Sequence, residues 1–249
     1  MLLLHYLAFY VSLGTSHILI SPPQTQHHVA DQDQTTMPSA SNPTIYFGYG
    51  SNLWLHQMSI RCPDAKYLGI ARLNNYTWII NDRGYANVVD IPSPPTTAQS
   101  DEYDNTVYGL VYSLTPADEV RLDRNEGVPI AYTKEHLDCD FWSAGAPSTP
   151  DSRHAKIDTR KAPDCSREML VYIDRQRVTA DEPRREYIYR MNRGIADAVE
   201  LGVPEEYVER VMRKFIPAET EEDGEEGRTM AEFAKGQAKE FRDESGVFR

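Results

Sequence analysis

The sequence predicts an α+β fold in which a curled, barrel-like mixed β-sheet is surrounded by helices. Most strand candidates lie in the first two thirds of the chain and most helix candidates in the last third, an order typical of α+β domains. The chain has 249 residues, of which 40% are hydrophobic, enough for one sizeable core. We therefore expect one globular domain with unstructured ends.

The strand candidates are short apolar or aromatic runs that end at Gly, Pro or polar residues. The first of them, TIYFGY, runs directly into a glycine-containing loop. Residues 97–105 and 144–166 are polar or Pro-containing and are predicted to be surface loops. The strand candidates are residues 44–49, 66–73, 76–80, 86–89, 106–114, 134–142 and 169–173.

Capping signals mark the helix candidates. One helix opens with Thr115 as the cap and Pro116 at the first helical position, and Gly127 ends it. A long amphipathic helix ends before Gly202. The helix candidates are residues 52–61, 116–126, 183–201 and 204–215, with a last, weak amphipathic segment carrying Met230, Phe233, Gln237 and Phe241.

The two ends of the chain differ from its centre in composition. Residues 1–42 are predicted to be an apolar leader followed by a disordered linker rich in Pro, Gln, Thr and Ser. The apolar run is shorter than the roughly 20 residues of a membrane-spanning helix, and no Lys or Arg precedes it. We expect a cytoplasmic protein, with secretion or anchoring by the leader left open. Residues 218–249 are predicted to be an acidic, weakly helical tail.

Charge and cysteine usage argue against several function classes. Residues 219–226 carry six acids, half of the net charge of −12, and nothing in the rest of the chain predicts a basic face. Nucleic acid is therefore not an expected partner. Cys62, Cys139 and Cys165 have neither a disulfide framework nor metal-ligand spacing, and the seven His residues show none either. We expect core or loop thiols in a reducing compartment, and no metal site.

The first candidate site is the loop Gly48-Tyr49-Gly50-Ser51-Asn52. It resembles the start of a dinucleotide-binding fingerprint, but Leu53 stands where the third Gly is needed, so we expect no nucleotide cofactor. A junction of strand, Gly loop and helix exposes backbone N–H groups where negative charge is favoured. The loop therefore predicts a site for a small anion such as a substrate carboxylate, with a tight structural turn as the alternative.

The second candidate site is Glu126, the last side chain before Gly127. The negative end of the helix dipole disfavours its ionisation there. Partial burial would raise its pKa further, which would suit it to carry protons near neutral pH. The alternative is a solvated surface glutamate.

Together the two sites resemble the gamma-glutamylcyclotransferases. The resemblance rests on Tyr-Gly-Ser-Asn-Leu at residues 49–53, after an aromatic strand, and on Asn-Glu-Gly at residues 125–127, after a strand and a short helix. The stretches CPDAKYLGIARL and LGVPEEYVERV extend it over about residues 44–217. Related subfamilies share parts of the loop, so the subfamily stays open.

The resemblance implies a barrel-like sheet of about six strands and a cofactor-free lyase. Such an enzyme converts a gamma-glutamyl compound into 5-oxoproline and a released amine. It implies Glu126 as the acid/base catalyst, and Tyr132 resembles a further family Tyr at a spacing one residue shorter. The residues implied to bind the gamma-glutamyl group are Tyr46, Phe47, Gly48, Tyr49, Gly50, Ser51 and Tyr172.

The sequence thus predicts a gamma-glutamylcyclotransferase acting on a small-molecule substrate, with a homodimer and the identity of the leaving amine left open. One alternative is a non-catalytic gamma-glutamyl-binding module, against which Glu126 counts. Another is a glycoside hydrolase using Asp123 and Glu126, but acids three residues apart on a helix are more typical of a solvated face. A third is the same chemistry on a glutathione conjugate, as in fungal relatives that act in toxin biosynthesis.

Overall fold

The computed structural model describes residues 42–91, 103–145, 154–219 and 225–248. Residues 41–249 form one compact unit. The predicted leader and linker up to residue 41, and residues 220–224 of the acidic run, lie outside the described ranges. Within these ranges, no helix combines the length and the apolar character needed to cross a membrane.

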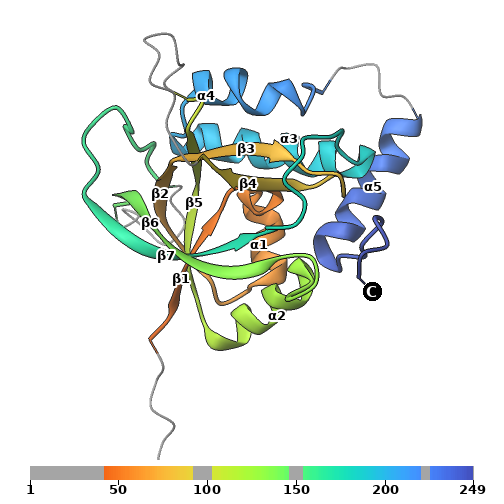
Figure 1. The fold of residues 1–249 in the computed structure, drawn as a ribbon, viewed down its shortest axis with the longest axis horizontal. Coiled ribbons are helices and arrows are strands. Elements are labelled where there is room, and N and C mark those ends of the chain that lie inside the picture. The colour runs from red at the N-terminus through yellow and green to blue at the C-terminus, as the bar shows by residue number, and fades with distance from the viewer. Residues whose placement is uncertain (1–41, 92–102, 146–153, 220–224, 249) are drawn as a thin grey trace, which may run out of the picture. The chain divides into compact units, whose positions relative to one another are not determined.

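A closed barrel of five strands forms the centre of the fold in the described residues, in the order β1–β5–β2–β6–β7 (Figure 1). β1 and β7 pair in parallel, with Tyr46 opposite Leu170, and the other neighbours are antiparallel. This confirms the predicted α+β fold with a curled mixed sheet. The barrel strands are β1 (Thr44–Gly48), β2 (Lys66–Asn74), β5 (Thr106–Leu114), β6 (Thr133–Ser143) and β7 (Cys165–Ile173).

The barrel has five strands in the described residues instead of the expected six or so, because two further strands are not part of it. β3 (Tyr76–Ile80) and β4 (Ala86–Asp90) pair only with each other and form a separate hairpin among the described residues. β7 also begins four residues earlier than predicted. Its first four residues are exposed, so no apolar alternation marks this part of the strand in the sequence.

The helix that begins at Pro116 follows the predicted capping signals. Thr115 Oγ1 accepts a 3.2 Å hydrogen bond from the backbone N–H of Asp118, and Gly127 ends the helix in the left-handed conformation at φ 66°. The predicted helix 52–61 is split into a 3-10 turn and a helix, and so is 204–215. The helical elements are η1 (Ser51–Leu53), α1 (Leu55–Arg61), α2 (Pro116–Glu126), α3 (Arg185–Leu201), α4 (Glu205–Arg210), η2 (Met212–Lys214) and α5 (Glu225–Lys239).

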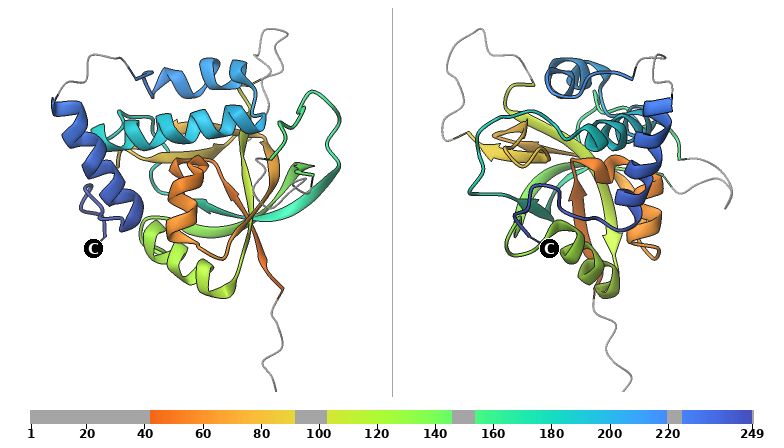
Figure 2. Two further views of the ribbon diagram at one scale, coloured as in Figure 1. Left: turned by 180° about the vertical axis from the view of Figure 1, so that it is seen from behind. Right: turned by 90° about the vertical axis from the view of Figure 1, so that its right-hand side faces the viewer.

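The C-terminal segment belongs to the same compact unit as the barrel. In it, α5 packs beside α1 and α3 (Figure 2). The buried face of α5 carries Ala234 and Ala238, which are fully buried, whereas Phe233 is 45% exposed. Of the residues that suggested this amphipathic segment, Gln237 is buried.

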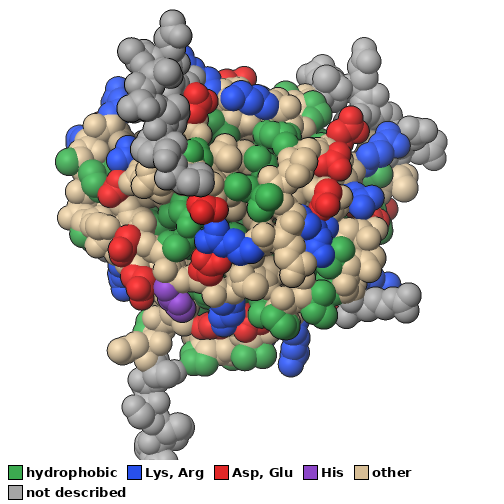
Figure 3. All heavy atoms as spheres, viewed as in Figure 1, with side chains coloured by type: hydrophobic (Ala, Val, Ile, Leu, Met, Phe, Trp, Pro, Cys, Tyr) green, Lys and Arg blue, Asp and Glu red, His purple; other side chains and the backbone are tan. Residues whose placement is uncertain are grey.

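The surface of the molecule carries charges of both signs. On the face drawn in Figure 3, Lys and Arg side chains lie interspersed with Asp and Glu side chains. Cys62 and Cys139 are buried and Cys165 is exposed, all three as free thiols.

Candidate active site

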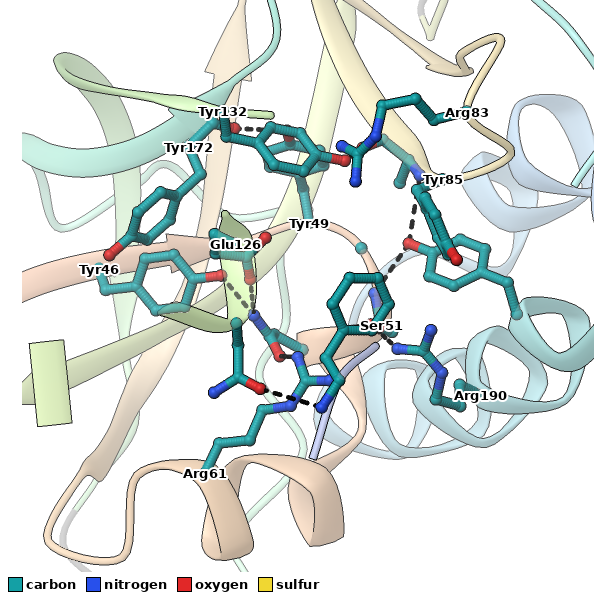
Figure 4. A pocket seen from close by; sticks show the side chains of 16 residues that line it. Tyr46, Tyr49, Ser51, Arg61, Arg83, Tyr85, Glu126, Tyr132, Tyr172 and Arg190 are labelled. Atoms are coloured by element: carbon teal, nitrogen blue, oxygen red, sulfur yellow. Dashed lines mark hydrogen bonds between the residues drawn. The ribbon is translucent and has the colours of Figure 1, made fainter. Parts of the chain in front are cut away.

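A cavity gathers side chains from β1, the loop after it, the end of α2, β7, the β3–β4 hairpin, α3 and the segment after α5 (Figure 4). Six predicted site residues line it, namely Tyr46, Tyr49, Gly50, Ser51, Glu126 and Tyr172. The rest of the lining consists of Asn52, Arg61, Arg83, Tyr85, Ala86, Asn125, Tyr132, Tyr187, Arg190 and Phe241. The two sequence candidates therefore meet in one place, with Asn52 of the loop 74 residues before Glu126.

Phe47 and Gly48 do not line the cavity, which departs from the prediction. Successive side chains of a strand point to opposite faces, so Phe47 turns away from Tyr46 into the core, where it is fully buried. Its ring occupies the space over Gly109, where an added Cβ would lie 2.7 Å from the Phe47 ring and 2.5 Å from the carbonyl oxygen of Gly48. Both residues thus serve the packing of β1 against β5.

Glu126 is fixed by the loop that the sequence singled out. Its Oε1 accepts a 2.9 Å hydrogen bond from Asn52 Nδ2, and the same amide donates to Tyr46 Oη at 2.8 Å. Burial raises the pKa of Glu126, and the charge of Arg61 and the hydrogen bond from Asn52 oppose that rise. The raised pKa agrees with the expectation from sequence, with burial as its main cause.

The loop itself is held by α1 and α3. Ser51 Oγ accepts hydrogen bonds from Gln57 Nε2 at 3.0 Å and from Arg190 Nη1 at 2.9 Å, and the Ser51 N–H donates to Tyr187 Oη at 3.2 Å. A Cβ on Gly50 would lie 2.8 Å from Tyr187 Oη. Gly50 is therefore required by the close approach of α3, in addition to any approach of a ligand.

Tyrosines form much of the remaining wall. Tyr49 Oη donates to the carbonyl oxygen of Tyr172 at 2.5 Å, and Tyr132 Oη donates to that of Ala86 at 2.8 Å. Burial raises the pKa of Tyr46, Tyr49 and Tyr132 well above its usual value, so these hydroxyls stay neutral. Tyr132, the weaker match to the family pattern, thus lies in the cavity with the others.

Asp123 does not form a carboxylate pair with Glu126. It accepts a 2.6 Å hydrogen bond from Tyr172 Oη and lies 3.1 Å from Lys134 Nζ, which also contacts Glu119. Asp123 is not part of the cavity lining. The arrangement of two acids flanking a sugar, which the glycosidase alternative needs, is therefore not found at these two residues.

Sequence reasoning missed the three arginines that line the cavity. Arg190 forms a buried pair with Glu186 through two hydrogen bonds of 2.8 Å. Burial, together with the charge of Arg190, lowers the pKa of Arg61 to about 10, so it remains a cation at neutral pH. Arg83 lies in the β3–β4 turn. Only Arg190 could have been predicted from the sequence as a neighbour of Tyr187, since it follows Tyr187 by three residues and so lies on the same helix face.

The residues of this cavity are not arranged as a metal site. In the described parts of the chain, no group of three or more His, Cys, Asp and Glu side chains is placed to hold a metal ion. The chemistry that the lining offers is a proton-carrying carboxyl group surrounded by hydroxyls, amides and guanidinium groups.

Comparisons with known proteins identify the fold. No family model matches the chain, and no curated protein matches it. Among solved structures it is similar to a gamma-glutamyl cyclotransferase, with 20% sequence identity and a TM-score of 0.50 over 78% of this chain and 98% of that one. An uncharacterized protein from Homo sapiens is similar at 20% identity and a TM-score of 0.50, over 78% and 99% of the two chains. The chain has the gamma-glutamyl cyclotransferase-like fold.

Proposed function

We propose that this protein is a gamma-glutamylcyclotransferase, an enzyme that cyclises a gamma-glutamyl compound to 5-oxoproline and releases the amine. The observation that carries the proposal is Glu126. Its carboxyl group has a raised pKa, lies in the cavity and is hydrogen-bonded to Asn52 of the Gly-Ser-Asn loop. The fold shared with a gamma-glutamyl cyclotransferase supports it.

The reaction needs a proton carrier rather than a protein nucleophile. The substrate's α-nitrogen attacks its own γ-carbonyl carbon, forming the C–N bond of a five-membered lactam, and the C–N bond to the leaving amine breaks. The α-ammonium nitrogen loses two protons, and the leaving nitrogen gains two. Glu126 can carry them, a role that contributes about 10²–10⁴-fold. Holding the glutamyl chain folded lowers the barrier further, by roughly 7–11 kcal/mol at most.

The loop supplies the binding site for the glutamyl head in this proposal. Gly50 and Ser51 open the three-residue turn η1 and line the cavity, and we assign the α-carboxylate of the substrate to this loop. Tyr46, Tyr49 and Tyr172 form the wall next to Glu126. Phe47 and Gly48 act by positioning β1 and are not assigned a substrate contact.

Replacement of Glu126 by glutamine tests the proposal. Glutamine retains an acceptor oxygen for Asn52 but cannot carry the proton, so we expect kcat to fall about 10²–10⁴-fold with substrate binding retained. The assay is 5-oxoproline release from a panel of gamma-glutamyl amino acids, gamma-glutamyl amines, glutathione and glutathione adducts. Glu119→Gln is the control, because Glu119 lies on the same helix but outside the cavity lining.

The outcomes separate the alternatives. Full turnover by Glu126→Gln would show that another group moves the protons. Binding of gamma-glutamyl compounds without 5-oxoproline from any of them would show a non-catalytic binding module. Turnover confined to glutathione adducts would assign the same chemistry to that substrate.

A further inference from the structure

Arg83 is a buried cation, and one of its nitrogen atoms has no hydrogen-bond acceptor among the described residues. Its side chain is 2% exposed, and Nη2 lies 3.1 Å from Asp243 Oδ1 while Nε donates to Ser245 Oγ at 3.2 Å. Nη1 is buried and has no hydrogen-bond partner among the residues that the structure describes. Figure 4 shows the guanidinium group pointing into the cavity. A buried donor without a partner is costly, so an acceptor from a ligand would be favoured there.

The other two arginines of the cavity are already occupied. Arg190 uses Nε and Nη2 on Glu186 and Nη1 on Ser51. Arg61 uses Nε and Nη2 on two main-chain carbonyls at the end of α5 and Nη1 on Asn52. Arg83 is thus distinguished from both by its free Nη1.

The surroundings of Arg83 hold its guanidinium plane in place. Its central carbon lies 5.2 Å from the ring centroids of both Tyr85 and Tyr132, and 5.5 Å from that of Phe248. Asp243 and Ser245 fix the edge of the group that faces away from the cavity. With its plane fixed, the guanidinium group presents Nη1 as a pre-positioned charged donor, which forms a stronger hydrogen bond with a carboxylate than with a neutral acceptor.

We propose that Arg83 binds a carboxylate on the leaving-amine part of the substrate through Nη1, so that the enzyme selects gamma-glutamyl amino acids over gamma-glutamyl amines. The inference rests on the proposed function. The glutamyl head has one carboxylate, which the Gly50–Ser51 loop receives. Arg83 comes from a different element, the β3–β4 hairpin, and so provides a second anion site. A gamma-glutamyl amino acid carries the second carboxylate that this site needs.

Two substrates that differ only in this carboxylate provide the test. Gamma-glutamyl alanine and gamma-glutamyl ethylamine have leaving amines of the same carbon skeleton apart from that group. We expect wild-type kcat/KM to favour gamma-glutamyl alanine by roughly 10- to 100-fold, as for a hydrogen bond to a charged group. The difference should appear mainly in KM. Equal kcat/KM for the two substrates would overturn the proposal.

Variants of the full chain assign the preference to Arg83. In Arg83→Gln the preference for gamma-glutamyl alanine over gamma-glutamyl ethylamine should disappear, and Arg83→Lys should retain part of it. Arg175→Gln is the matched control, because Arg175 is an ion-paired arginine outside the cavity, bound to Asp90 and Glu135. An equal loss on both substrates in Arg83→Gln would place Arg83 on the glutamyl head and overturn the assignment to the leaving group.

Calorimetry separates this inference from the proposed function. If neither compound yields 5-oxoproline, the proposed function fails, but binding of the two compounds is still measurable. Tighter binding of gamma-glutamyl alanine that is lost in Arg83→Gln and reduced in Arg83→Lys supports the carboxylate site. Binding that is equal for both compounds, or a preference that both Arg83 variants retain, refutes it. If Arg83→Gln does not fold, Arg83→Lys decides by the same two measurements.

Discussion

Replacing Asp243 with asparagine removes the counter-ion of Arg83 and retains the size of the side chain. The Asp243 side chain is fully buried, and the 3.1 Å pair with Arg83 is shielded from water on both sides. The same carboxylate accepts backbone hydrogen bonds from Val247 at 2.7 Å and Phe248 at 3.1 Å. The substitution therefore weakens the anchor of the last residues and leaves a buried guanidinium group without its negative partner.

Removing one partner of a buried ion pair costs about 3–5 kcal/mol. Asparagine keeps one acceptor oxygen for the backbone N–H groups, so we expect the lower end, a loss of about 3 kcal/mol in the free energy of unfolding. A domain of this kind has about 5–15 kcal/mol in total. The variant should still fold, with a clearly lower midpoint in urea at an unchanged slope.

The pH dependence gives a second check on Asp243. Burial acts to raise its pKa, but hydrogen bonds from Ser245 and Phe248 and the charge of Arg83 lower it overall. A lowered pKa contributes stability above the unfolded-state value, about 3.9, and that stability is lost as the pH falls through the folded-state value. The difference between wild type and variant should thus be full at pH 7 and shrink below about pH 4.

Urea unfolding at pH 7 and at low pH measures both effects. Asp158→Asn is the control, since Asp158 pairs with Arg160 at the surface and its loss should leave the midpoint unchanged. An Asp243→Asn variant that unfolds with the wild-type midpoint at pH 7 would refute the view that this pair anchors the C-terminal segment.

Three further predictions concern the cavity and its boundaries. Burial raises the pKa of Glu126. The protonated carboxyl group therefore contributes its full stability below the unfolded-state pKa, and this stability is lost as the pH rises through the folded-state pKa. Glu126→Gln should unfold at a higher urea concentration than wild type at pH 8, and at the same urea concentration as wild type at pH 4. Arg61 is the strongest influence lowering that pKa, so Arg61→Gln should move the acid limb of the kcat/KM profile to higher pH. A chain of residues 43–217 should lose 5-oxoproline release, because Phe241 lines the cavity and Asp243 anchors Arg83, whereas a chain of residues 43–249 should retain it. Unchanged midpoints, an unmoved limb or an active short chain would contradict these expectations in turn.

Local chemical signals made the central part of the site predictable. The run before Gly48 marked β1, and Thr115, Pro116 and Gly127 marked both ends of α2. Since Glu126 is the last residue of that helix, its position followed directly. These signals depend on neighbouring residues only, so one sequence is enough to show them.

Long-range packing was not predictable from the same sequence. The buried face of α5 uses Ala234 and Ala238, small residues that allow close approach to other helices but give little apolar signal. Arg83 lies in a turn and gains its role only through Asp243, 160 residues later. The sequence pattern around it is that of an ordinary exposed turn, and nothing local indicates burial.

The same ion pairs that hold the cavity together also set its charge. Arg190 and Arg83 are each balanced by a buried carboxylate, Glu186 and Asp243, whereas Arg61 donates to neutral oxygens. With Glu126 ionised, these six groups sum to zero charge; once Glu126 takes up a proton, they carry one positive charge. An anionic group of a ligand is held more strongly in that second state. In the proposed reaction Glu126 reaches this state when it accepts the proton of the α-ammonium group. The cavity therefore binds a substrate carboxylate most strongly after Glu126 has accepted this proton and before the leaving nitrogen is protonated.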